Sequence, residues 1–160
     1  MKPLISNIIT GITGSDASIS AGKYAIVMAK NYHCQLSMIY VVDTATIKQL
    51  TLHKIFVPEE SIEYERSLEA NGERYLSFMD ELARSKGIKI TKEIRRGAVY
   101  TEILTAAEEH RADLIVMGGW EKERSVRDII GNAHHEIMIN AKCSVLVVKE
   151  SNIDQIFKQA

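Results

Sequence analysis

Residues 112–119 read Ala-Asp-Leu-Ile-Val-Met-Gly-Gly, an apolar run that ends in two glycines. Four consecutive apolar residues, Leu114 to Met117, favour a strand covered on both faces, because a half-exposed strand would alternate apolar and polar positions. The glycines that follow, Gly118 and Gly119, predict a loop at the end of that strand. This stretch indicates a parallel sheet with helices on both sides.

The rest of the chain alternates short β-branched runs with segments of helical spacing. The runs are residues 7–12, 35–42, 88–94, 113–117 and 144–148. Between them, apolar residues recur at steps of three and four, in stripes within 17–28, 68–83, 103–107 and 130–141. Strands that alternate with helices pair in parallel through right-handed crossovers. We therefore predict an α/β fold.

Local signals mark the ends of the helices. Ser15 or Asp16 can cap the first helix, since a short polar side chain accepts a hydrogen bond from its first turn. Gly87 stands where a glycine is expected after the second helix. Segment 43–60 has little periodicity, so we expect a long loop or a short irregular helix.

Composition bounds the location and partners of the chain. Its 160 residues suit one domain, with 46% hydrophobic and 26% charged residues. A net charge of −1 gives no field that draws it to nucleic acid or to an anionic membrane. No apolar run approaches the roughly 20 residues of a membrane span, and no signal peptide is evident. We expect a cytoplasmic protein without nucleic-acid or membrane partners, with Cys34 and Cys143 reduced and buried.

The tail, residues 150–160, follows the last predicted strand. It is polar apart from three residues whose spacing fits one short amphipathic helix, Ile153, Ile156 and Phe157. Such a helix packs either on its own domain or on a partner.

In an open parallel sheet, ligands bind at the carboxyl ends of the strands, where the strand order reverses. Three loops are expected to meet there: residues 11–16, the segment that begins near 41–43, and the segment from Gly118 onward. The third reads GGWEKERSVRDIIGNAHHEI over 118–137. Its glycines and the predicted helix start at Gly131 suit an anion, because the first N–H groups of a helix have no partner within it.

Two interpretations fit this third loop. In one, Lys122 and Arg124 add positive charge and the loop holds phosphate oxygens. In the other, the loop is solvated and Asn132 is an ordinary helix cap. Trp120 covers a ligand, shields the loop or contacts a partner, and the sequence does not choose between these roles.

Signatures of other chemistries are missing from the sequence. It contains no P-loop, no G-x-G-x-x-G fingerprint and no G-x-S-x-G elbow. His134 and His135 are adjacent, so on a helix they point about 100° apart and chelate one ion poorly. We expect no catalytic residues and no metal site, and we expect His33, His53 and His110 at the surface or at the ends of helices or strands.

Four blocks of sequence carry a resemblance to a known family. They are IITGITGS at 8–15, LSMIYVVD at 36–43, AAEEHRADLIVMG at 106–118 and AKCSVLVV at 141–148. In this order the chain resembles the universal stress protein family over about residues 5 to 149. The resemblance implies an open, twisted five-stranded parallel sheet of order 3-2-1-4-5 with helices on both faces, like the adenine-nucleotide alpha-hydrolases. It also implies one domain, 1–149, followed by the tail at 150–160.

The resemblance further implies a homodimer that pairs through the last strand. An apolar strand at the edge of a sheet is open to pairing with another chain, which independently favours a dimer. The residues of that strand are Ser144, Val145, Leu146, Val147 and Val148.

ATP-binding members of the family carry a glycine, two residues, a second glycine, nine residues, then a glycine and a serine or threonine. Here Gly118 and Gly131 match the first and third glycines. Glu121 replaces the second glycine, and Asn132 replaces the final hydroxyl residue. Glycine lets backbone approach a phosphate closely, whereas glutamate adds bulk and a negative charge.

Two further positions of the family's nucleotide site can be placed. The aspartate that follows the first strand in ATP-binding members is Thr13 here, and the backbone contact of the second strand falls at Val41. From these changes we predict a dimeric stress-response module with a degenerate nucleotide cleft, no catalytic activity and no cofactor. The alternative is a member that binds ATP with Mg²⁺, or another adenine nucleotide, through an adapted loop, and that at most hydrolyses ATP very slowly.

Overall fold

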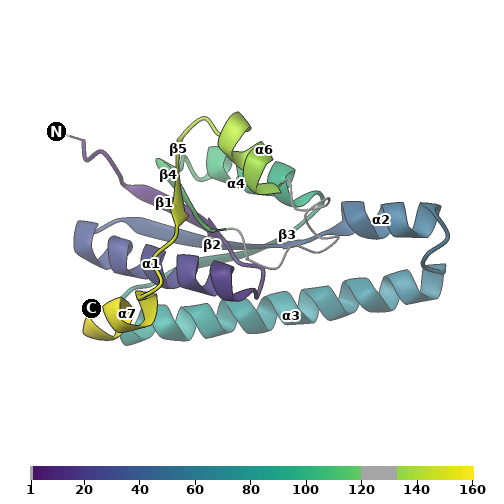
Figure 1. Ribbon diagram of the computed structural model, residues 1–160, viewed down its shortest axis with the longest axis horizontal. Coiled ribbons are helices and arrows are strands. Elements are labelled where there is room, and N and C mark those ends of the chain that lie inside the picture. The colour runs from purple at the N-terminus through teal and green to yellow at the C-terminus, as the bar shows by residue number, and fades with distance from the viewer. Residues whose placement is uncertain (1, 120–132) are drawn as a thin grey trace.

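The computed structural model describes residues 2–119 and 133–160. Within them, five parallel strands form one sheet of order β3-β2-β1-β4-β5 (Figure 1). The predicted strand order is confirmed, and β5 lies at an edge of the sheet. The strands are β1 (Asn7–Gly11), β2 (Gln35–Val42), β3 (Thr91–Arg96), β4 (Leu114–Gly118) and β5 (Ser144–Val148).

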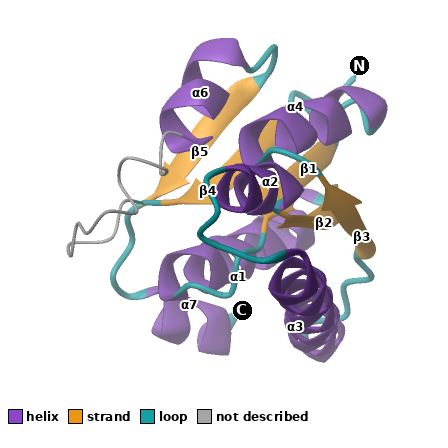
Figure 2. Ribbon diagram, turned by 90° about the vertical axis from the view of Figure 1, so that its right-hand side faces the viewer, coloured by secondary structure: helices purple, strands orange, loops and turns teal. Residues whose placement is uncertain are grey.

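Helices cover both faces of the sheet, as predicted. One face carries α1 (Asp16–Tyr32), α3 (Pro58–Ser85) and α7 (Ile153–Gln159), and the other carries α4 (Val99–Glu109) and α6 (Ala133–Asn140) (Figure 2). A further helix, α2 (Thr44–Leu52), lies beyond the end of the sheet, and α3 runs back alongside it. None of the helices in the described ranges is long and apolar enough to cross a membrane.

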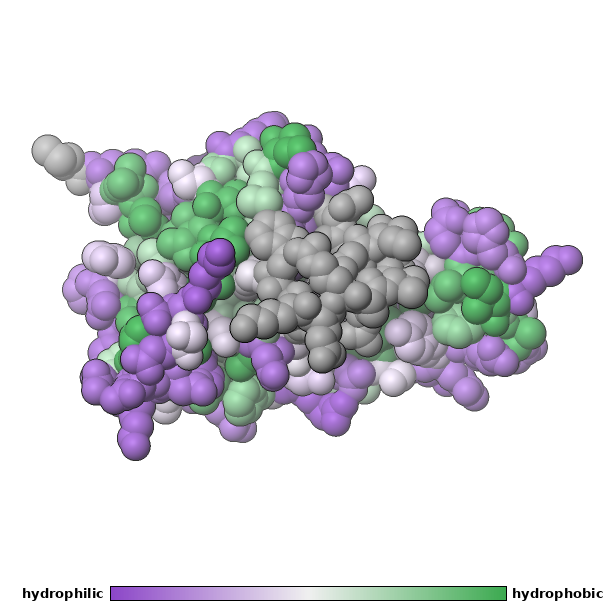
Figure 3. Space-filling model, viewed as in Figure 1, coloured by the Kyte–Doolittle hydropathy of each residue, from purple (hydrophilic) through white to green (hydrophobic). Residues whose placement is uncertain are grey.

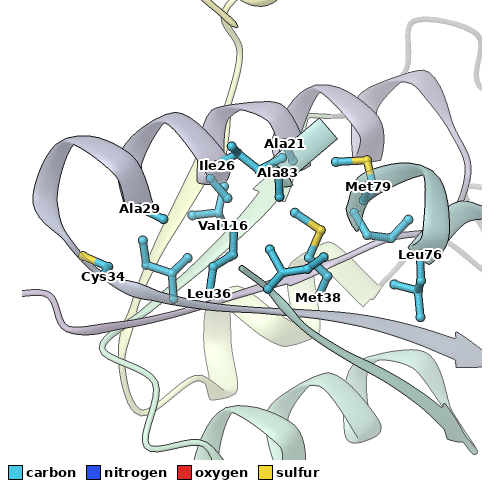
Figure 4. Close-up of a cluster of buried hydrophobic side chains, with 14 of the residues drawn as sticks. Ala21, Ile26, Ala29, Cys34, Leu36, Met38, Leu76, Met79, Ala83 and Val116 are labelled. Carbon is cyan, nitrogen blue, oxygen red and sulfur yellow. The ribbon is translucent and has the colours of Figure 1, made fainter. Parts of the chain in front are cut away.

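Two hydrophobic cores lie on the two faces of the sheet. Successive side chains of a strand point to opposite faces, so Ile8 belongs to one core and Ile9 to the other. In the same way Val116 packs beneath α1 (Figure 4), whereas Ile115 packs on the side of α4. This division explains the continuous apolar run of β4, since both of its faces are buried.

The helix ends largely match the residues that the sequence singled out. Ser15, rather than Asp16, caps α1, because its side chain accepts a hydrogen bond from the N–H of Ser18 at 3.2 Å. Gly87 follows α3 with a φ of +75°, the left-handed conformation expected after a helix. His33, His53 and His110 each stand at a helix C-terminus, so the expectation that they end elements is confirmed.

The third strand begins later than predicted. The apolar run suggested residues 88–94, but β3 spans Thr91–Arg96. The backbone N–H of Ile88 donates to the carbonyl of Ala83 at 2.9 Å, so Ile88 closes the end of α3 instead of pairing in the sheet.

Segment 43–60 contains a regular helix. Asp43 caps α2, because its carboxylate accepts from the N–H of Thr46 at 3.0 Å and from the hydroxyl of Thr46 at 2.7 Å. Only residues 53–57 separate α2 from α3, so the expectation of a long loop is wrong. The short helix of the other alternative is present, but it is a regular α-helix and not an irregular one.

The tail forms the predicted helix, α7, and packs on its own domain. Ile153 and Phe157 are buried, and Asp154 forms an ion pair with Lys23 of α1 at 2.6 Å. The ammonium of Lys86 lies 4.8 Å from the centre of the Phe157 ring. Of the two cysteines, Cys34 is buried as expected, whereas Cys143 is half-buried.

Candidate functional site

The candidate site lies at the carboxyl ends of β2, β1 and β4, which are neighbours in the sheet. From β1 the chain passes to β2 on one side, while β4 pairs with β1 on the other, so the strand order reverses between β1 and β4. Crevices outside such a reversal are where open α/β sheets bind ligands. The first predicted loop, residues 11–16, lies at this place, and residues 12–15 of it join β1 to α1.

Ser18 organises the first loop from within α1. Its hydroxyl oxygen accepts hydrogen bonds from the N–H groups of Thr13 and Gly14, at 3.1 and 3.2 Å, and the hydroxyl donates to the carbonyl of Ser15 at 3.0 Å. A serine hydroxyl has one proton and two lone pairs, so these three bonds use its full capacity. The amides of Thr13 and Gly14 are thereby committed to the loop and do not form a cradle for an anion.

Thr13 is exposed, and its hydroxyl also bonds within the loop. Its Oγ1 lies 2.9 Å from the Oγ of Ser15 and accepts from the N–H of Ser15 at 3.3 Å. The residue therefore presents a neutral hydroxyl at the edge of the site, where ATP-binding relatives are expected to present a carboxylate.

Tyr75 of α3 covers the same loop, a contact that the sequence did not suggest. Gly14 has a φ of +89°, and a Cβ added to it would lie 2.4 Å from the Tyr75 ring. Glycine is therefore required twice at this position, for its conformation and for the approach of the ring. The sequence placed Tyr75 only in the apolar stripe of its helix, and the glycine opposite was the one hint of a close neighbour.

Gly118 has a structural reason to be glycine. A Cβ at this position would lie 2.5 Å from the backbone oxygen of Ala17, in the first turn of α1. The end of β4 and the start of α1 thus touch through their backbones. The first glycine of the family's phosphate motif is explained by this packing, without any ligand.

Val41 lies where β2 extends past β1. The last β1 residue, Gly11, is paired with Ile39, and Val41 follows two residues later, paired on its other side with Arg95 of β3. Asp43, two residues further on, is occupied as the cap of α2. Val41 therefore lies at the carboxyl end of the sheet, beside the candidate site.

The structure thus brings Thr13, Val41 and Gly118 together at the carboxyl ends of three neighbouring strands, β1, β2 and β4. The other predicted positions lie outside the described residues: Glu121, Lys122, Arg124, Gly131 and Asn132, together with Trp120. Two cavities in the described part of the chain lie elsewhere, one of about 320 Å³ between α3 and β3 and one of about 130 Å³ between α4 and the start of β5.

A group of charged side chains joins β3, the strand next to β2, to α4. The guanidinium of Arg95, which is mostly buried, contacts Glu93, Glu102 and Glu109 at 2.5, 3.0 and 2.8 Å. His110 lies 2.7 Å from Glu93. Burial opposes ionisation of Glu93, but hydrogen bonds with His110 and Arg95 outweigh it and lower the pKa of Glu93. Because each carboxylate is held by Arg95, the group serves to fasten α4 to the sheet.

The sequence model of the universal stress protein family matches residues 5–149. The chain belongs to the universal stress protein family. It is 35% identical over 147 residues to universal stress protein MJ0531 of Methanocaldococcus jannaschii, covering 92% of this chain and 84% of that one. It is 28% identical to universal stress protein YxiE of Bacillus subtilis, covering 91% of this chain and 100% of that one.

Solved universal stress proteins share the fold. The UspA structure from Lactobacillus plantarum superposes with a TM-score of 0.76 at 22% identity, covering 92% of this chain and all of that one. A universal stress protein solved in complex with cAMP has a TM-score of 0.59 at 19% identity, covering 90% and 96% of the two chains. A structure from Archaeoglobus fulgidus in complex with dAMP has a TM-score of 0.61 at 14% identity, covering 92% and 100%.

Proposed function

We propose that this universal stress protein is a cytoplasmic, homodimeric stress-response module that acts through interactions rather than catalysis and that binds ATP weakly. The observation that carries the proposal is Glu121, which stands at the second glycine of the family's phosphate motif. A glutamate in place of that glycine would bring a negative charge near those of a bound triphosphate. At about 4 Å, each pair of like charges costs roughly 1 to 4 kcal/mol, depending on screening.

The first loop supports the same proposal. The hydroxyl of Thr13 is hydrogen-bonded to Ser15, and the amides of Thr13 and Gly14 are taken by Ser18. The loop therefore offers a nucleoside one neutral side chain instead of a charged acceptor. A hydrogen bond to a charged group is worth about 1.5 to 3 kcal/mol, more than the roughly 0.5 to 1.5 kcal/mol of a neutral one, so binding is expected to weaken here as well.

A second candidate function is the binding of an adenine nucleotide with one phosphate. Related proteins were solved with cAMP and with dAMP, each of which has a single phosphate group. This chain keeps Gly118 and Gly131 of the motif, and a monophosphate brings less negative charge near Glu121 than a triphosphate does. Such a member would sense a nucleotide without being able to hydrolyse a triphosphate.

Calorimetric titration separates the two candidates. ATP with Mg²⁺, AMP and cAMP are each titrated into the wild-type protein and into Glu121→Gly and Glu121→Gln. We expect weak ATP binding by the wild type. Glu121→Gly should bind ATP at least fivefold more tightly, because it removes a repulsion of at least about 1 kcal/mol and about 1.4 kcal/mol corresponds to a factor of ten in affinity. Glu121→Gln removes the charge but keeps the bulk, so it measures the electrostatic part of the gain.

The outcome also decides between the candidates. Micromolar binding of AMP or cAMP by the wild type, with much weaker ATP binding, would establish the second function. Tight ATP binding by the wild type that does not improve in Glu121→Gly would contradict the repulsion argument and with it the proposed function.

A further inference from the structure

The helices α2 and α3 form a hairpin that projects beyond the sheet (Figure 1). At about 1.5 Å per residue, the 28 residues of α3 span about 42 Å. Its buried residues all lie from Gly72 onward, and Ile47 is the one buried residue of α2. We call residues 44–66 the arm, because this part of the hairpin has little packing on the body of the protein.

Large apolar side chains are exposed on the arm. Single exposed apolar residues are common on protein surfaces, but a contiguous group marks an interaction site. Figure 3 shows such a hydrophobic group at the end of the molecule where α2 meets α3. The exposed fractions are 65% for Leu52, 63% for Ile55, 50% for Val57, 53% for Ile62 and 44% for Tyr64.

Leu52 and Ile62 point to the same side of the arm. The hydroxyls of Thr51 and Ser61 lie 2.6 Å apart, so these two residues are on the faces of α2 and α3 that touch. The next residue of each helix is turned by about 100°. Because α2 and α3 are antiparallel, the step from Thr51 to Leu52 and the step from Ser61 to Ile62 turn in opposite senses when both helices are viewed from the same end. Both steps start from the faces that touch, so both bring the next side chain to the same side of the hairpin. Leu52 and Ile62 thus form one apolar face.

The other side of the arm is closed differently. Tyr64 follows Ser61 by three residues and so turns to the side opposite Ile62. There its ring contacts that of Phe56, with centroids 5.5 Å apart. The face of Leu52 and Ile62, with Ile55 and Val57 in the turn beside it, is therefore the side of the arm that lacks such cover among the described residues.

The charges of the arm fit a second copy of the chain better than a strongly charged partner. A face that selects a basic or acidic partner carries an excess of one sign, whereas a two-fold contact places each charge of one copy opposite charges of the other. The arm carries both signs in nearly equal number, with Lys48, Lys54 and Arg66 against Glu59, Glu60, Glu63 and Glu65.

The make-up of the arm also suits such a contact. A stable interface buries about 800 Å² on each partner. Leu52, Ile55, Val57 and Ile62, all at least half exposed, would supply the apolar centre of such an interface, and the charged residues around them its rim. Two hairpins packed face to face would form a four-helix contact, a stable arrangement for amphipathic helices.

We propose that the arm is a self-association surface, on which the Leu52–Ile62 face of one chain docks against the same face of a second copy. This contact is separate from the edge of β5, and it does not depend on nucleotide binding.

Sedimentation velocity over a concentration series tests the proposal on the full chain. Ile62→Glu is expected to weaken one association step at least tenfold, because it places a charge in the centre of the apolar face. Phe78→Glu is the matched control: Phe78 lies on the same helix and is 44% exposed, but it lies outside the arm, so this variant should associate like the wild type. Circular dichroism confirms that both variants remain folded.

A mixing experiment distinguishes self-association from a general effect of charge. Ile62→Glu and Ile62→Lys should each fail to associate through the arm, whereas an equimolar mixture should recover the step, since opposite charges then meet across the two-fold axis. Unchanged sedimentation of Ile62→Glu, or a mixture that behaves like its separate components, would overturn the proposal.

Discussion

At the scale of single residues, Asp113 shows how one carboxylate fixes the alignment of two strands. It accepts hydrogen bonds from the N–H groups of Ser6 and Asn7, at 2.8 and 3.0 Å, while its own N–H donates to the carbonyl of Asn7 at 2.8 Å. The backbone donors favour the ionised form and lower the pKa of Asp113 below its ordinary value. The start of β1 is thereby held against the start of β4.

We expect Asp113→Asn to destabilise the protein at neutral pH and to do so less at acidic pH. Because the folded-state pKa is lowered, the stabilisation is present above the unfolded-state pKa of about 4 and is lost as the pH falls through the folded-state value. Urea unfolding of both proteins at pH 7 and at about pH 3 measures the difference. The other carboxylates titrate in both proteins, so their effects cancel in the difference in unfolding free energy between the wild type and Asp113→Asn. A difference that stays constant with pH would contradict the role given to Asp113.

At the scale of elements, α3 is held to the sheet by the fit of an aromatic ring to a glycine. Gly72 lies in the middle of the helix, where glycine is unfavourable by up to about 1 kcal/mol relative to alanine. A Cβ at Gly72 would lie 2.4 Å from the ring of Tyr40, which is buried in β2. The glycine is thus retained for the approach of helix to strand.

Gly72→Ala should therefore destabilise the protein, although the same change in an exposed helix would stabilise it. We expect a loss of about 1 to 3 kcal/mol from overpacking against Tyr40. Gly87→Ala is the control, since a Cβ there meets nothing within 4 Å and only the left-handed backbone opposes it. Equilibrium unfolding of both variants measures these losses. Gly72→Ala is also made in a Tyr40→Leu background, where its loss of unfolding free energy should be smaller. A stabilised Gly72→Ala protein would contradict the packing argument.

The elements that the sequence predicted well are those whose signal is a long, regular pattern. The apolar run of β4 is continuous because both faces of the strand are buried. The apolar residues of α3 form a stripe because only one face of that helix is buried. Both elements were predicted correctly. The helix α2 is short and buries only Ile47, so its periodicity is weak and the cap at Asp43 was its best signal. The start of β3 was missed because Ile88 is β-branched, yet its N–H is used to end α3.

The candidate site was predictable to the same degree. The three loops that hold Thr13, Val41 and Gly118 follow from the ends of strands, and a correct strand order places them together. The family resemblance, rather than the pattern, singled out Thr13 and Val41 within them. The cover of Gly14 by Tyr75 could not be predicted, because it depends on how a distant helix crosses the first loop. The bonding of Ser18 to that loop likewise needed the geometry of the helix start.

At the scale of the whole molecule, the two edges of the sheet differ in chemistry. The edge strand β3 reads Thr-Lys-Glu-Ile-Arg-Arg, and charged side chains discourage the pairing of edges. The opposite edge strand, β5, reads Ser-Val-Leu-Val-Val and carries no charge. A second chain is therefore expected to add at β5, as the proposed homodimer requires.

Val147→Lys should weaken this dimer at least tenfold, because a lysine in the strand brings like charges together when two copies of β5 pair. Ile94→Lys makes the same substitution in the other edge strand, at a residue that is also partly buried, and should leave the dimer intact. Light scattering after size-exclusion chromatography measures both, with thermal unfolding as a check on folding. A Val147→Lys protein that remains fully dimeric would exclude β5 as the interface.

The backbone contact between Gly118 and Ala17 bears on how members of this family are sorted from their sequences. Any relative that seats its first helix as closely against the fourth strand must keep a glycine there, whether or not a nucleotide ever binds. A search that credits this glycine as a sign of nucleotide binding will therefore gather members that retain it for packing alone. Classification should instead weigh the positions equivalent to Glu121 and Asn132, where a change of side chain alters what a phosphate would meet.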